Sequence, residues 1–163
     1  MKKYSLIAIS ITLSFILQTS LFKFINIFGT LPNLSLVLVV TFSMMTNGII
    51  GGLIGLFTGI LFDSMMYDVF GIYTLVYFVI GASIGTYADD MQRDNFAAYT
   101  VIATLSTIVF HFLLYMILFF LRYRLETAAG FLVSILTEAV LNALVVIIVL
   151  KLILKAFDVL NIK

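Results

Sequence analysis

The stretch GIIGGLIGLFTGILFDSMMYDVFG, residues 48–71, decides the fold of this chain. Gly51, Gly55, Gly59 and Asp63 recur at every fourth position of an apolar run, so an α-helix places them on one face as a ridge that ends in a carboxylate. In water, each glycine inside a helix costs about 1 kcal/mol relative to alanine. In lipid, small residues instead let neighbouring helices approach closely. The stretch therefore predicts the central packing helix of a membrane protein.

This glycine ridge has two interpretations, because small-residue faces serve both purposes in membranes. Packing against another helix of the same chain is the favoured one, and a surface for a partner's helix is the alternative. A second, shorter pair of small residues, Gly81 and Gly85, follows on the next apolar run, which Gly71 opens. We expect these glycines to mark helix-packing faces.

The composition agrees with a membrane protein. Of the 163 residues, 63% are hydrophobic and 10% are charged, whereas globular domains have about 45–50% and about 25%. Mean hydropathy is +1.23. The chain has no cysteine, which excludes disulfides and thiolate metal sites, and a formal net charge of +1 gives no electrostatic case for binding nucleic acid. No cofactor motif is present, and we expect neither a cofactor nor a metal.

The apolar runs predict an all-α integral membrane protein with six transmembrane helices in a single membrane domain, residues 1–163. The first run follows a basic start but lacks a signal-peptidase site, so we interpret it as a retained helix. Pro32 suits the first turn of the second helix, and the second and third runs predict a tight antiparallel hairpin. The expected helices cover residues 4–22, 31–47, 48–66, 72–88, 96–121 and 128–157.

Six spans place both termini on the same side of the membrane. That side has six Lys and Arg residues and the opposite side has three, so the positive-inside rule predicts that both termini are cytoplasmic. The six are Lys2, Lys3, Arg93, Lys151, Lys155 and Lys163, and the three are Lys23, Arg122 and Arg124.

Polar side chains fall in the middle or outer half of four expected spans: Gln18, Asp63, His111 and Glu138. Asn142 lies four residues after Glu138, on the same helix face. The favoured interpretation is that these groups hydrogen-bond one another and fix helix register. The alternatives are a ligand or ion site, or a proton relay or catalysis. Asp63 has a further interpretation, since it lies near the end of its helix.

Two further features carry weaker hypotheses. Residues 81–85, GASIG, fit a nucleophile-elbow pattern around Ser83 with His111 as a possible base, but the elbow needs a strand–turn–helix context that an apolar helical run lacks. We therefore predict that the protein is not an enzyme. The charged loop 89–95 is interpreted as a solvated turn, or alternatively as a docking site for a cytoplasmic partner through Asp89, Asp90 and Arg93.

The order of these features resembles the bacterial rod shape-determining protein MreD family. The resemblance rests on a first helix that ends in QTSLF at residues 18–22, on Gly29, on Pro32-Asn33-Leu34, on the glycine ridge with Asp63, and on Gly71. Family members commonly have P-D-L or P-N-L at the position of residues 32–34. The resemblance covers essentially the whole chain.

The resemblance implies a non-enzymatic scaffold or adaptor of the cell-elongation machinery in the bacterial cytoplasmic membrane. Its implied partners are an MreC-like single-pass protein, MreB-like actin filaments, a peptidoglycan glycosyltransferase and transpeptidase, and membrane lipids. The implied fold is similar to that of the substrate-binding subunits of energy-coupling-factor transporters. A vitamin-type substrate-binding subunit is therefore the alternative function, with Gln18, Asp63, His111 and Glu138 as pocket residues. Such subunits carry A-x-x-x-A on the first helix, which Ala8 and Thr12 match poorly.

Overall fold

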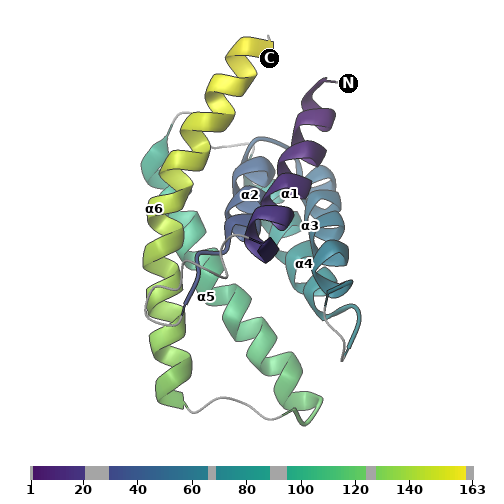
Figure 1. Ribbon diagram of the computed structural model, residues 1–163, viewed down its shortest axis with the longest axis vertical. Helices are drawn as coiled ribbons and strands as arrows, with labels where there is room; N and C mark the ends of the chain where they lie inside the picture. Colours follow the sequence, from purple (N-terminus) through teal and green to yellow (C-terminus); the bar gives the residue numbers. More distant parts are fainter. Residues whose placement is uncertain (1, 21–29, 66–68, 89–94, 124–127, 161–163) are drawn as a thin grey trace.

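The computed structural model describes residues 2–20, 30–65, 69–88, 95–123 and 128–160 (Figure 1). Six helices account for most of these residues, and the start of α1 and the end of α6 lie at the same end of the molecule. The helices are α1 (Lys2–Ser20), α2 (Leu34–Met44), α3 (Gly48–Asp63), α4 (Ile72–Tyr87), α5 (Phe96–Phe120) and α6 (Ala128–Leu160).

The centre of the bundle is α2, not the glycine-rich helix that the sequence predicted. Every residue from Ser35 to Met44 is buried, and α2 contacts all five other helices. Its run LSLVLVVTFSM is apolar on every side, as is typical of a helix that protein surrounds completely. With 11 residues, α2 is only about 16 Å long.

The second helix is shorter than predicted at both ends. It begins at Leu34 because the side chain of Asn33 caps it by accepting a hydrogen bond from the Leu36 amide. Pro32 therefore precedes the cap instead of lying in the first turn, so that expectation was wrong. The other boundaries agree with the predicted ones to within a few residues, and α6 continues to Leu160.

The turn after α2 is as tight as predicted. The amide of Met45 donates to Phe42 O, and Asn47 caps α3 by accepting from the Ile50 amide. The Lys3 ammonium donates to Met45 O at 2.9 Å, which holds the start of α1 beside this turn. The end of α2 thus lies at the same end of the bundle as the N-terminus.

Among the described residues, two helices are by length and composition able to cross a membrane on their own: Phe96–Phe120 and Gly130–Leu160. The helices α2, α3 and α4 are apolar but shorter. The prediction of six helices is confirmed within the described residues, and six complete spans remain a prediction.

Large apolar side chains cover much of the exterior of the described bundle. On α6 they form a stripe at every fourth residue: Leu132, Leu136, Val140, Leu144, Ile148 and Leu152, all more than half exposed. Polar side chains lie inside instead, among them Ser35, Thr41, Thr58, Thr107 and Asn142. A protein in water instead keeps large apolar patches away from its surface. Exposed apolar patches of this extent mark contact with lipid or with other proteins.

Candidate functional site

The polar interior is organised around Asn33, in the short segment before α2. Its side-chain oxygen accepts hydrogen bonds from the Leu36 amide at 3.0 Å, from the Tyr77 hydroxyl at 3.0 Å and from Gln18 Nε2 at 3.5 Å. The backbone amide of Asn33 donates to Asn142 Oδ1 at 2.8 Å. Asn33 thereby connects α1, α2, α4 and α6 through one buried residue.

Asn142 extends this network to α5. It is fully buried, and its Nδ2 donates to Thr107 Oγ1 at 2.9 Å. The Thr107 hydroxyl in turn donates to Ala103 O within α5. Both functional groups of the Asn142 amide are therefore used, one on the chain before α2 and one on α5.

Gln18 completes the network from α1. Its Oε1 accepts from the Ser35 amide at 3.2 Å, while the Ser35 hydroxyl lies 3.1 Å from the hydroxyl of Ser14. The amides of Asn33, Ser35 and Leu36 all lie at the start of α2, where a helix has no internal acceptors. Side chains from α1 and α6, together with Asn33 itself, accept from all three.

These contacts give the polar residues a structural task that the sequence did not reveal. The start of a short helix is buried inside the protein, where an unpaired amide would cost about 1–3 kcal/mol, and side chains of other helices satisfy it. The pattern that points to this task is Pro32-Asn33 before a short apolar run, since Asn is a preferred N-cap. The sequence alone indicates a loop motif at Asn33 and gives no sign that this residue joins Gln18 and Asn142.

Asp63 performs the same task for a different helix. Its carboxylate accepts from the amides of Tyr73 and Thr74 at 3.0 and 2.9 Å, and from the Thr74 hydroxyl. Gly71, at the N-cap position of α4, has φ of +108° and provides no side chain, so the last residue of α3 caps α4 instead. Asp63 therefore belongs to the α3–α4 turn, and no described hydrogen bond joins it to Gln18, His111 or Glu138.

His111 and Glu138 form a separate pair between α5 and α6. His111 Nε2 lies 2.8 Å from Glu138 Oε2, and the two side chains are 18% and 10% exposed. The rings of Phe110 and Phe131 approach the imidazole edge-on. The other carboxylate oxygen, Oε1, is buried and has no hydrogen-bond partner among the described residues. Glu138 and Asn142 share one face of α6 and both bind α5, Glu138 through His111 and Asn142 through Thr107, while Asn142 also binds the start of α2.

The glycines of α3 lie directly against α4. A Cβ atom added at Gly51, Gly55 or Gly59 would come closer than 3.0 Å to the α4 backbone, a separation that real Cβ atoms essentially never show. Gly81 and Gly85 face back toward the backbone at Gly51 and Asn47 in the same way. Since α4 covers the glycine ridge within the chain, that ridge is not free for another protein's helix.

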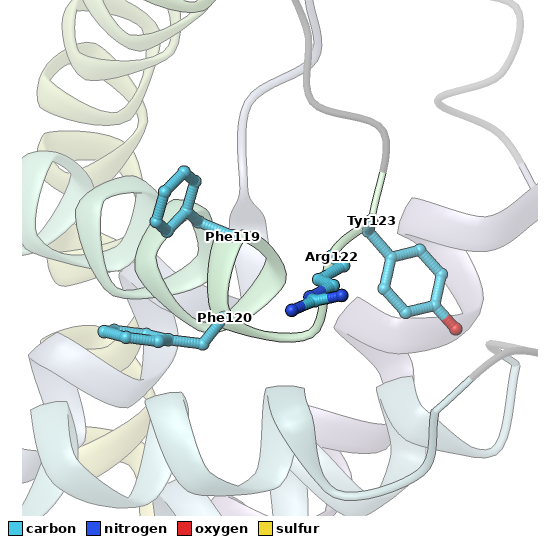
Figure 2. Close-up of a pocket in the computed structure, with 4 residues that line it drawn as sticks. All are labelled: Phe119, Phe120, Arg122 and Tyr123. Carbon is cyan, nitrogen blue, oxygen red and sulfur yellow. The ribbon is translucent and has the colours of Figure 1, made fainter.

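A hollow of about 540 Å³ lies at the C-terminal end of α5 (Figure 2). Phe119, Phe120, Arg122 and Tyr123 line it, all of them exposed. Aromatic rings beside a cation are typical of a helix end at a membrane–water interface. We therefore interpret these residues as an anchor of α5 in the interface.

The remaining predicted residues do not assemble into a site. Asp89, Asp90 and Arg93 lie outside the described residues. Ser83 is exposed on α4, which is an unbroken helix from Ile72 to Tyr87 and so does not form a nucleophile elbow. Within the part of the chain that the structure describes, no group of three or more His, Asp or Glu side chains could hold a metal ion.

Comparison with known proteins identifies a family. The family model described as rod shape-determining protein MreD matches residues 2–156. No curated protein and no solved structure matches the chain, and the likeness to transporter substrate-binding subunits therefore remains a prediction.

Proposed function

The chain belongs to the MreD family of rod shape-determining proteins, and from this premise we propose that it is a multi-pass membrane scaffold of the cell-elongation machinery. In this role it connects an MreC-like single-pass protein and MreB-like filaments to the glycosyltransferase and transpeptidase that build peptidoglycan. The observation that carries the proposal is the family match over residues 2–156.

The arrangement of the polar network supports insertion of the whole bundle in the membrane. Asn142 lies near the middle of the 33-residue α6, so the start of α2, bonded to it, is proposed to lie within the bilayer that α6 spans. Irregular backbone at that depth is tolerated only where protein groups satisfy it. Gln18, Asn33 and Asn142 satisfy it here, and the exposed apolar side chains around the bundle face lipid.

The same contacts favour a scaffold over a vitamin-binding subunit. A binding pocket needs polar groups that are free to meet a ligand, whereas Gln18 and Asp63 bond to backbone amides and His111 bonds to Glu138. The second carboxylate oxygen of Glu138 has no partner among the described residues, but it is buried. The hollows found on the described surface are lined mainly by apolar side chains. The protein therefore offers partners its helix faces and ends, not a polar cavity.

Both termini are proposed to be cytoplasmic. The start of α1 and the end of α6 lie together (Figure 1), and Lys2, Lys3, Lys151 and Lys155 lie on these two segments. A concentration of cations at one end of a membrane bundle favours the cytoplasmic side for that end.

Two measurements test the proposed function. In a rod-shaped bacterium whose own MreD-family gene is deleted, the full chain should restore rod shape, whereas an unrelated tagged membrane protein should leave the cells round. Purification of the tagged chain from its native membrane should recover an MreC-like protein and wall-synthesis enzymes. Recovery of a vitamin-transport ATPase without any wall-synthesis protein would overturn the proposal.

A further inference from the structure

An apolar furrow runs along the bundle between α1 and α6. Both helices pack against α2 but make few or no contacts with each other, which leaves a hollow of about 290 Å³ floored by Leu38 and Ile153. Leu13 and Leu152 form its rims and are 54% and 62% exposed. The hollow is an apolar groove that is open to the surroundings of the protein.

A cation lies at the end of this furrow. A second hollow, lined by Lys2, Ile9 and Leu160, continues the furrow toward the chain termini and shares Leu6 with it. Lys2 is exposed at the start of α1, and none of the described residues that line either hollow is acidic. The furrow thus joins an apolar channel at membrane depth to a positive charge at the membrane surface.

We propose that the α1–α6 furrow binds an anionic phospholipid, with an acyl chain along the apolar channel and the phosphate at the Lys2 ammonium. A juxtamembrane lysine attracts anionic headgroups, an effect of about fivefold in affinity for each charge. A lipid suits the rims better than a helix does, because close helix packing in membranes favours small residues and the rims are leucines. This inference rests on the proposed membrane insertion and not on the role in wall synthesis.

The absence of tryptophan from the chain provides a direct test. A single Leu13→Trp variant places a fluorophore on the rim of the furrow, and Leu144→Trp places one on the outer stripe of α6, outside both hollows. Each full-length variant is reconstituted in phosphatidylcholine bilayers that contain a small fraction of brominated phosphatidylglycerol or, separately, brominated phosphatidylcholine. Bromine quenches tryptophan fluorescence on contact, so the ratio of quenching measures the preference of each position for the anionic lipid.

At position 13 we expect the anionic lipid to bind about five times as tightly as the zwitterionic one, and at position 144 we expect no preference. Adding Lys2→Gln should abolish the preference at position 13. Lys151→Gln is the matched control, because Lys151 is an exposed cation of α6 that lines neither hollow, and it should leave the preference unchanged.

Three other outcomes would overturn the proposal. Equal quenching by both lipids at position 13 would show an ordinary lipid-facing surface. Quenching by neither lipid at position 13, with quenching at position 144, would show that a second copy of the chain covers the furrow. Absence of quenching at both positions would contradict membrane insertion itself, a failure distinct from that of the lipid site.

Discussion

Asn33 shows how much of the structure depends on one side chain. Its oxygen serves the first turn of α2 and the buried Tyr77 hydroxyl together, so replacing it leaves two donors without an acceptor in the interior. A helix cap contributes about 1 kcal/mol, and a buried unsatisfied donor costs about 1–3 kcal/mol. Asn33 is therefore worth more than an ordinary cap.

We predict that Asn33→Ala destabilises the protein by about 2–4 kcal/mol. The measurement is thermal or denaturant unfolding of the purified protein in detergent micelles. Asn47→Ala is the matched control, since Asn47 also caps a helix but is exposed, and it should cost only about 1 kcal/mol. Equal losses in the two variants would mean that Asn33 acts only as a cap.

The His111–Glu138 pair makes a different prediction, because a polar pair that is largely withdrawn from the surroundings is weak evidence for stability. His111→Leu leaves the Glu138 carboxyl buried without its partner and should cost about 3–5 kcal/mol. The double variant His111→Leu/Glu138→Leu removes both polar groups and should be more stable than the His111→Leu variant. The measurement is the free energy of unfolding of His111→Leu, Glu138→Leu and the double variant in the same detergent. A double variant as unstable as His111→Leu would refute the prediction.

The α3–α4 hairpin extends the argument to whole elements. Its two helices meet backbone to backbone, because glycines on each helix face the other. A side-chain cap joins the two helix ends, since Asp63 at the end of α3 accepts hydrogen bonds from the amides at the start of α4. A four-residue spacing of small residues that ends in a carboxylate therefore specifies both the packing face and the partner helix.

Two glycines of α3 provide a matched pair for testing this packing. At Gly55 an added Cβ meets the backbone of Tyr77, which cannot move away, whereas at Gly52 it meets the ring of Phe78, which can. We predict that Gly55→Ala destabilises the protein by about 1–3 kcal/mol through overpacking. Gly52→Ala should stay within about 1 kcal/mol of the parent, since alanine also favours the helix. Similar unfolding midpoints for the two variants would argue against backbone-level packing.

The sequence predicts those features of the architecture that depend on residues close together in the chain, and not those that depend on contacts between distant segments. The spacing of Gly51, Gly55 and Gly59 is local, and the structure places these three glycines against the backbone of α4. The central place of α2 is not local, because a helix that is apolar on all sides gives no sign of whether protein or lipid surrounds it. The Asn33–Asn142 bond joins residues 109 positions apart, and no periodicity within either segment predicts it.

At the scale of the whole molecule, the polar interior and the apolar exterior both follow from placing helix starts inside a membrane protein. Helices that begin inside a membrane protein need acceptors for their first amides. In this bundle the acceptors are the side chains of Gln18, Asn33, Asp63 and Asn142. These polar side chains therefore lie inside, and apolar side chains lie outside. Such a body can move and bind within the bilayer through its helix surfaces, as a scaffold requires.

The number of crossings is the prediction on which this description depends most. The helices α3 and α4 have 16 residues each, about 24 Å, and so they cross a 30 Å hydrocarbon layer only if it thins locally. Because the chain has no cysteine, single-cysteine variants report unambiguously on which side each turn lies. Exposed positions at the ends of successive helices are Met65, Tyr87, Tyr123 and Val159.

We predict that a membrane-impermeant maleimide labels Met65→Cys and Tyr123→Cys in intact cells, whereas Tyr87→Cys and Val159→Cys react only after permeabilisation. The reason is that α3 and α4 run antiparallel, as do α5 and α6, with the cation-rich end of α6 in the cytoplasm. Labelling of Met65→Cys and Tyr87→Cys from the same side would mean that α4 does not cross. Reversal of all four results would preserve the six crossings but place the termini outside, and Lys2 would then face the outer leaflet.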